Sequence, residues 1–201
     1  MKDEFLIDLL KLPPSFLVSK WLLDRIPYLF DNDRELYINW KERLATKLSV
    51  DSKSMAFTGS SSCGFSLNPN KNFKEFDENS DVDIAIVSQY YFDVSWRTLR
   101  NLGTKRFDLT PAQKASLEDH VQRLIYWGTI ATDKILEILP FGRDWALFMI
   151  EMSKENPTQN RSINFRIYKD YESLRFYQTN NLERIKTKQL TDNGEFPKYD
   201  K

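Results

Sequence analysis

The sequence predicts an α/β protein in which helices back a mixed, largely antiparallel sheet and a helical extension precedes it. Apolar residues recur at helical spacing through residues 4–49. Short apolar runs with turn residues beside them then indicate strands within residues 55–62 and 80–87, and two more at residues 145–152 and 162–168. With a length of 201 residues, this order of elements predicts a single domain over residues 1–190 and a flexible tail over residues 191–201.

The N-terminal extension is expected to contain three helices. The first covers residues 4–11. The second restarts at Pro13-Pro14-Ser15, runs to about residue 25 and is ended by Pro27. The third spans residues 34–49 and turns Leu36, Ile38, Trp40, Leu44 and Leu48 toward the interior.

The segment at residues 55–62 is an apolar strand that ends in a turn of small residues. Gly59 allows the backbone to approach a ligand closely. The amides and hydroxyls of Ser60 and Ser61 are suited to hold a triphosphate. A glycine-serine pair after a strand is common in ordinary turns, so this segment is informative only together with the next motif along the chain.

Two aspartates stand one residue apart at the head of the next apolar run. Because side chains alternate along a strand, Asp81 and Asp83 project to one side while Val82 and Ile84 face the core. Neighbouring carboxylates repel each other unless a cation neutralises them, and oxygen ligands of this kind suit Mg²⁺ or Mn²⁺. The alternative is a solvated strand edge, although aspartate is depleted in strands.

The Gly59-Ser60 turn followed by Ser80-Asp81-Val82-Asp83 resembles the signature of the nucleotidyltransferase superfamily. DNA polymerase beta, poly(A) polymerases and bacterial cyclic-oligonucleotide synthases share this fold. The resemblance covers roughly residues 35–190. The gap between the two halves of the signature is longer than usual for the superfamily, and its polar, turn-forming middle, residues 68–79, is expected to be a surface insertion.

In polymerase-beta-like enzymes, the second strand of a hairpin carries a third catalytic aspartate, in the pattern apolar, Asp, apolar, Arg, apolar. Residues 163–167 resemble this pattern, with Asn164 in place of the carboxylate. Asparagine offers a metal one neutral oxygen, but it cannot act as a base. In a hairpin of residues 145–152 and 162–168, Glu151 falls opposite Asn164 and supplies the missing carboxylate, whereas a register slip turns it to solvent. Asp170 is a weaker candidate, because it is placed to cap the closing helix.

Two further helices are expected. Thr110-Pro111 begins one that runs toward Leu139 and carries His120, in a structural or exposed position. The closing helix covers residues 171–188. In the tail, the hydroxyl of Tyr199 is a less favoured candidate acceptor, through which the protein would modify itself. The alternative is that Tyr199 has no functional role.

The composition excludes several classes of protein. The 29 basic and 29 acidic residues cancel, which argues against tight, sequence-independent binding of long duplex DNA. The single cysteine, Cys63, rules out an internal disulfide and a multi-cysteine zinc cluster. The absence of a membrane-length apolar run and of a basic signal-peptide head predicts a cytoplasmic protein that does not enter a membrane. Basic residues gather at positions 97–106, either as a solvated surface or, through Arg97 and Arg100, as a phosphate contact.

The resemblance implies a two-metal nucleotidyltransferase. Asp81 and Asp83 would bind Mg²⁺ or Mn²⁺, with Glu151 and Asn164 completing the catalytic set. A nucleoside monophosphate would pass from an NTP (such as ATP) or a dNTP to a hydroxyl acceptor, which is an oligonucleotide, RNA or protein. By analogy with small bacterial members, an anti-phage or toxin module with a partner protein encoded nearby is expected. The alternative is a degenerate nucleotidyltransferase that binds a nucleotide or regulates a partner. Base, sugar and acceptor stay open.

Overall fold

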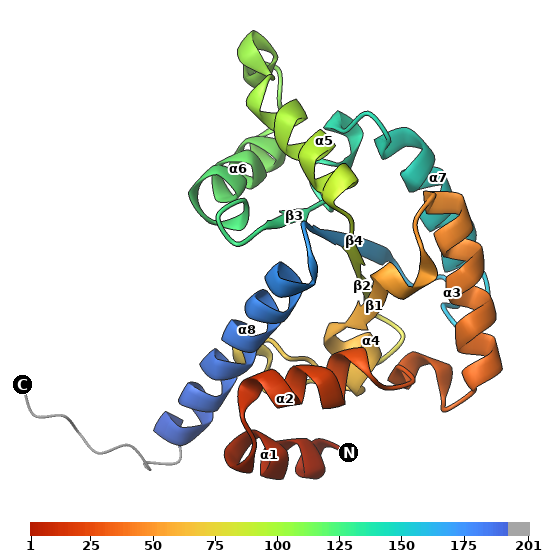
Figure 1. Ribbon diagram of the computed structural model, residues 1–201, viewed down its shortest axis with the longest axis vertical. Coiled ribbons are helices and arrows are strands. Elements are labelled where there is room, and N and C mark those ends of the chain that lie inside the picture. The colour runs from red at the N-terminus through yellow and green to blue at the C-terminus, as the bar shows by residue number, and fades with distance from the viewer. Residues whose placement is uncertain (193–201) are drawn as a thin grey trace, which may run out of the picture.

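A computed structural model describes residues 1–192 of the chain and shows a four-stranded sheet at its centre (Figure 1). The strand order is β1 (Met55–Thr58), β2 (Val82–Val87), β4 (Ile163–Tyr168) and β3 (Thr129–Ala131). The pairing of β2 with β4 is parallel, and the two outer pairings are antiparallel. The predicted mixed, largely antiparallel sheet is therefore confirmed.

One face of the sheet is entirely apolar. Val82, Ile84 and Ile86 alternate along β2, and Ile163, Phe165 and Ile167 do so along β4. These side chains are buried together with residues of α3 (Arg34–Leu48), α5 (Gln89–Arg100) and α7 (Gly142–Ser153). This layer holds the largest cluster of buried hydrophobic residues in the described part of the chain.

The opposite face is covered only in part. α8 (Tyr171–Asp192) crosses it, and Leu174 of α8 is buried against Ala85 and Tyr168 of the sheet. Toward the first residues of β2 and β4, this face carries Asp83 and Asn164, which are neighbours in the strand register. Polar groups thus lie where the cover of α8 ends.

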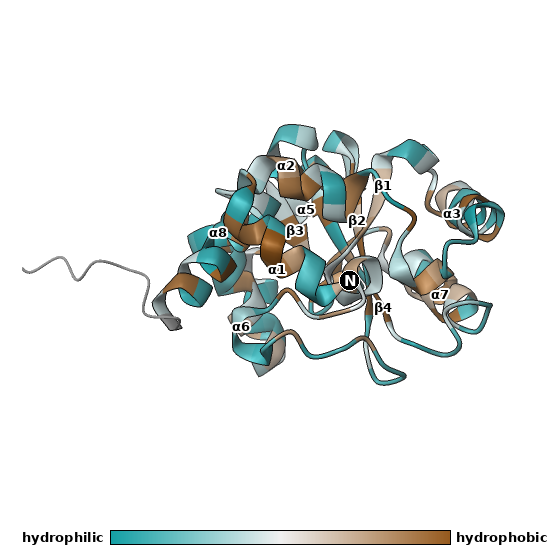
Figure 2. Ribbon diagram, turned by 90° about the horizontal axis from the view of Figure 1, so that it is seen from below, coloured by the Kyte–Doolittle hydropathy of each residue, from teal (hydrophilic) through white to brown (hydrophobic). Residues whose placement is uncertain are grey.

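The N-terminal helices pack beside α8 and away from the apolar face of the sheet. They are α1 (Lys2–Lys11) and α2 (Pro14–Val18), and α2 continues into a π-helical turn, Ser19–Leu23. Hydrophobic residues alternate with hydrophilic ones along both (Figure 2), and Phe5, Leu17 and Trp21 are buried in a second cluster with Leu182 of α8. The predicted N-terminal helices are thus present.

The hairpin expected at residues 145–168 is wrong. Residues 142–153 form α7, in which Trp145 and Met152 are buried at helical spacing. β4 instead pairs in parallel with β2, and a parallel pair requires a crossover, not a tight turn. An apolar run of this length fits a helix as well as a strand, and because β2 and β3 already lie on the two sides of β4, no edge of β4 is left for it to pair with.

The long helix expected from Thr110 to Leu139 is also wrong. α6 (Pro111–Asp119) begins at the predicted Thr110 cap but soon passes into a π-helical turn, His120–Leu124, and then into β3. Gly128 lies between them with φ +64°, and a Cβ there would come within 2.3 Å of the Ser173 hydroxyl. This glycine therefore allows both the reversal of the chain and its close contact with α8.

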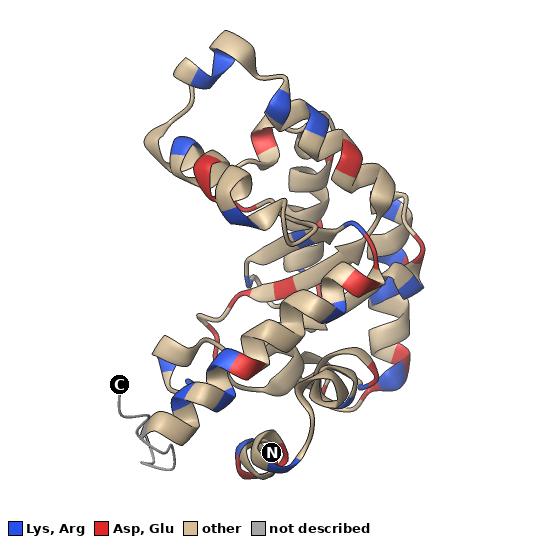
Figure 3. Ribbon diagram, turned by 60° about the vertical axis from the view of Figure 1, so that its left-hand side comes forward, with Lys and Arg blue, Asp and Glu red and all other residues tan. Residues whose placement is uncertain are grey.

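The remaining elements are short. α4 (Gly59–Cys63) follows β1 directly, and 3-10 turns cover Tyr28–Phe30, Ser52–Ser54, Pro69–Lys71, Gly103–Phe107 and Leu136–Ile138. No helix among residues 1–192 is long and apolar enough to cross a membrane. Lys and Arg are interspersed with Asp and Glu over all parts of the molecule (Figure 3), which agrees with the zero net charge.

Candidate active site

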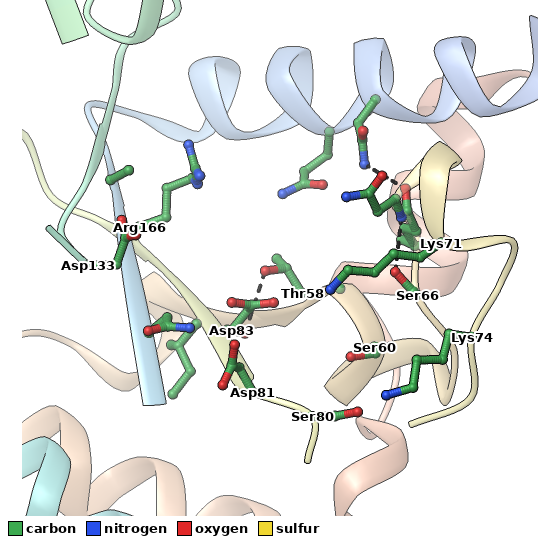
Figure 4. A pocket seen from close by; sticks show the side chains of 18 of the residues that line it. Thr58, Ser60, Ser66, Lys71, Lys74, Ser80, Asp81, Asp83, Asp133 and Arg166 are labelled. Atoms are coloured by element: carbon green, nitrogen blue, oxygen red, sulfur yellow. Dashed lines mark hydrogen bonds between the residues drawn. The ribbon is translucent and has the colours of Figure 1, made fainter. Parts of the chain in front are cut away.

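A polar cavity of about 660 Å³ opens beside the first residues of β2 and β4. The end of β1, the segment from Ser66 to Asp81 and one side of α8 form its walls (Figure 4). Its lining contains both acidic and basic side chains: Glu75, Asp81, Asp83, Asp133, Lys71, Lys74, Arg166 and Arg184. The cavity therefore offers ligands for a cation and for an anion within one space.

Asp81 and Asp83 both line this cavity, as their alternation along the chain predicts. Asp81 directly precedes β2, and Asp83 is the second residue of the strand. Their carboxylates lie close together (Figure 4). Burial, followed by the repulsion from Asp81, raises the pKa of Asp83 to about 6, although the positive charges of Arg166 and Lys71 act in the opposite direction. A divalent cation between the two carboxylates would remove this repulsion.

Gly59, the first residue of α4, brings the start of this short helix into contact with Asp83. It has φ +61°, and a Cβ at this position would lie 2.9 Å from Oδ2 of Asp83. Only glycine permits this approach without displacing the carboxylate. Ser60 lines the cavity, but Ser61 is buried and its hydroxyl donates to the Thr58 carbonyl at 3.0 Å. The predicted role of the Ser61 side chain in binding phosphate is therefore wrong, because the hydroxyl does not reach the cavity.

Asn164 and Arg166 extend from β4 on the same side of the sheet. Asn164 is the register partner of Asp83, and a hydrogen bond from its side chain favours the charged form of that aspartate. The Arg166 guanidinium lies 5.0 Å from the centre of the Tyr177 ring. Its Nη1 is buried and has no hydrogen-bond partner among the described residues. Arg166 as a residue lines the cavity, and its positive charge is suited to an anionic ligand there.

Glu151 does not take part in this site. It is exposed on α7, where it pairs with Lys47 at 2.8 Å, and it does not line the cavity. The prediction placed it opposite Asn164 on a neighbouring strand, but the neighbours of β4 are β2 and β3. The helical conformation of residues 142–153 thus removes the expected replacement carboxylate.

Arg97 and Arg100 are also absent from the cavity lining. Both lie in the last turn of α5, which follows the far end of β2, whereas Asp83 lies at its beginning. The Arg100 guanidinium is 4.4 Å from the centre of the Trp96 ring. Their proximity to Asp83 in sequence was misleading, because the strand and the helix carry the chain away from the site.

The segment expected to be a surface insertion, and not the end of α5, contributes lysine side chains to the cavity lining. Lys71 ends the turn Pro69–Lys71 and reaches toward Asp83 (Figure 4), while Lys74 pairs with Asp77 at 2.8 Å. Lys188 of α8 donates to the Pro69 carbonyl at 2.6 Å and holds the segment beside α8. The signal that could have been noticed is apolar: Leu67 and Phe73 flank this turn and are buried.

Asp133 is a further carboxylate in the cavity lining and follows β3. Even so, no three residues among His, Cys, Asp and Glu are grouped as potential metal ligands in residues 1–192. A divalent ion here would be held by Asp81 and Asp83, with the uncharged side chain of Asn164 beside them. The remaining coordination positions would be available to oxygens of a substrate.

The other candidate groups have structural roles. The His120 ring is buried, with Ser116 O 2.6 Å from Nδ1, while Nε2 accepts the Ala131 amide at 3.1 Å. The Cys63 thiol is fully buried, and burial raises its pKa to about 12. Asp170 caps α8 by accepting the Ser173 amide at 2.7 Å. Tyr199 lies outside the described residues.

No protein-family model, no curated protein and no solved structure matches this chain. Its function is therefore argued from the cavity and from the residues that line it.

Proposed function

We propose that the chain is a metal-dependent nucleotidyltransferase, which moves a nucleoside monophosphate from an NTP or dNTP to a hydroxyl acceptor and releases pyrophosphate. The observation that carries this proposal is the convergence of Asp81, Asp83 and Gly59 on one cavity, which also contains the basic side chains of Lys71 and Arg166. A site for a metal-bound triphosphate needs these two kinds of ligand side by side.

The acidic part of the site fits Mg²⁺ or Mn²⁺. Two carboxylates repel each other here, and this repulsion adds to burial in raising the pKa of Asp83 to about 6. Hard divalent ions prefer such oxygen ligands. When bound, the metal would supply charge neutralisation and a lower pKa for the attacking hydroxyl. The protein's own contribution is to fix both carboxylates at the start of one strand, so that they need no rearrangement.

The basic part of the site fits the phosphates. Arg166 and Lys71 both line the cavity, and neither forms a salt bridge within residues 1–192. Ser60 adds a hydroxyl group to the lining of the cavity. Arg166 lies on one side of the two aspartates, and Lys71 and Ser60 lie on the other (Figure 4), so a triphosphate held by these groups would lie close to the carboxylates.

A second candidate function is nucleotide binding without turnover. It is favoured by Asn164, which lies beside Asp83 where a third carboxylate would be expected. It is also favoured by the lack of any grouped third acidic ligand in the described residues. Asp133 is the carboxylate that distinguishes the two candidates most usefully, because it lines the cavity from the other side of β4.

The test is a transfer assay with labelled nucleoside triphosphates, Mg²⁺ or Mn²⁺, and RNA, DNA or the protein itself as acceptor. Parent protein, Asp83→Asn, Asp133→Asn and the exposed control Glu137→Gln are compared on denaturing gels. We expect label transfer by the parent and the control and none by Asp83→Asn. Loss in Asp133→Asn would give that residue a catalytic role. Binding of nucleotide without transfer by the parent would establish the second candidate instead.

A further inference from the structure

A second groove, of about 630 Å³, lies away from the proposed active site. It is formed by α5, by residues 125–128 before β3, and by the first turns of α8. It shares no lining residue with the polar cavity. Asn164 lines the polar cavity near the beginning of β4, and Lys169 lines the groove just after its end. The two positions are five residues apart in the sequence, which is roughly 16 Å along a strand.

The walls of this groove are aromatic and partly exposed. Tyr126 is 83% exposed and Phe176 54%. The Trp127 and Phe176 rings lie 5.0 Å apart and are tilted by only 31°, so that they form one continuous surface. The full aromatic lining is Phe92, Trp96, Tyr126, Trp127 and Phe176. Aromatic groups gathered around a groove and left open to solvent indicate a binding surface.

The charge of the groove is negative. Three carboxylates, Asp93, Asp170 and Glu172, face one ammonium group, Lys169. Asp170 is used as the cap of α8. Asp93 and Glu172 form no salt bridge within the described residues. Two carboxylates are thus available to a ligand beside the aromatic rings.

We propose that this groove binds an arginine-containing basic segment of a partner protein. A guanidinium stacks on indole faces and donates to carboxylates at the same time, which matches both features of the groove. One lining residue already takes part in such a contact: the guanidinium of Arg100, which is not itself a lining residue, lies 4.4 Å from the centre of the Trp96 ring.

Two other kinds of partner fit the groove less well. A single-stranded nucleic acid would stack its bases on the rings, but its phosphates would be repelled by Asp93 and Glu172. An uncharged apolar segment would bury those carboxylates without a partner, which is unfavourable. The proposal is independent of nucleotide transfer, because it rests on residues that the polar cavity does not use.

The experiment measures fluorescence anisotropy of labelled octapeptides with the full chain at about 0.15 M salt. The peptides alternate glycine with arginine, lysine or glutamate. We expect the arginine peptide to bind, the lysine peptide to bind roughly three-fold or more weakly because it lacks the planar fork, and the glutamate peptide not to bind. A saturating Mg²⁺-nucleotide mixture should leave this binding unchanged.

Variants then locate the binding. The double variant Asp93→Asn/Glu172→Gln should weaken binding of the arginine peptide by roughly five-fold or more. Tyr126→Ala/Phe176→Ser should also weaken it, and because both side chains are exposed the fold should persist, which circular dichroism checks. Glu183→Gln, an exposed change on α8 outside the groove, is the matched control.

Three results would overturn the proposal. One is the absence of binding by any arginine peptide. Another is equal binding by the parent and both groove variants. The third is tight binding of a labelled oligothymidylate that the Tyr126→Ala/Phe176→Ser variant loses, which would assign the groove to single-stranded nucleic acid instead.

Discussion

The two faces of the sheet differ in the side chains that they carry and in how far helices cover them. Along β2, Val82, Ile84 and Ile86 point into the apolar core, while the residues between them face α8 and the polar cavity. The first face is fully covered by helices. The second is covered at one end and open at the other, where Asp83 and Asn164 lie. The comparison shows that stability and the proposed chemistry are separated by the alternation of side chains.

The strongest test of this separation is to remove a large side chain from the apolar face. Trp145 of α7 is buried there, with its ring 5.3 Å from that of Phe165. We expect Trp145→Ala to lower the free energy of unfolding by about 3–5 kcal/mol, because it removes contacts and leaves a cavity. Urea unfolding measures the loss, and a cost below about 1 kcal/mol would contradict the assigned core.

On the polar face, the corresponding change should have the opposite sign. Asp83 has a raised pKa, about 6, so the folded protein binds its proton more tightly than the unfolded chain does. Its favourable contribution is complete below about pH 4 and is lost as pH rises through about 6. Without metal, Asp83→Asn should therefore raise the free energy of unfolding at pH 8 by about 1–3 kcal/mol.

The pH and metal dependence of this gain provide its controls. At about pH 4, where Asp83 is protonated in the folded protein, the variant and the parent should unfold at nearly the same urea concentration. Added Mg²⁺ with a nucleoside triphosphate should stabilise the parent but not Asp83→Asn. A variant that is less stable than the parent at pH 8 would contradict the account of repelling carboxylates.

Lys71 tests whether the segment at residues 66–81 belongs to the site. It faces Asp83 in the cavity (Figure 4), so Lys71→Ala should weaken triphosphate binding by roughly five- to ten-fold, equivalent to about 1 kcal/mol. Stability should be little affected, because the side chain is exposed. The control is Lys105→Ala, because Lys105 is exposed and lines neither the polar cavity nor the second groove. Equal triphosphate affinities of the two variants would contradict the placement of Lys71 in the site.

The smallest effect is expected at Glu151. Its pair with Lys47 lies at the surface, and such pairs contribute about 0–1 kcal/mol. Glu151→Gln should thus leave nucleotide affinity and label transfer unchanged. Calorimetric titration of the nucleotide and the transfer assay both check this, and a loss of transfer would place the residue in the site after all.

The sequence was sufficient where the decisive signal was local. The strands at β1 and β2, the helix α3 and the closing helix α8 follow from periodicity, caps and turn residues within a few positions. Asp81 and Asp83 line the same cavity because every second side chain of a strand points to the same side.

The errors occurred where distant parts of the chain decide the structure. The apolar pattern of β4 predicts a strand, but its parallel pairing with β2 depends on the long crossover over residues 88–162. β3 has only three residues and so shows no period. Lys188 of α8 donates to the segment that carries Lys71, and this contact joins residues more than a hundred positions apart, which no local pattern reveals.

The most direct test of the central claim is Mn²⁺ binding followed by electron paramagnetic resonance, with and without a non-hydrolysable nucleoside triphosphate, at pH 8. The account predicts that the parent binds Mn²⁺ through Asp81 and Asp83, that the nucleotide tightens this binding, and that Asp83→Asn abolishes both effects while Glu151→Gln retains them. Mn²⁺ binding that is equal in the parent and in Asp83→Asn, or absent from the parent even with nucleotide, would contradict it.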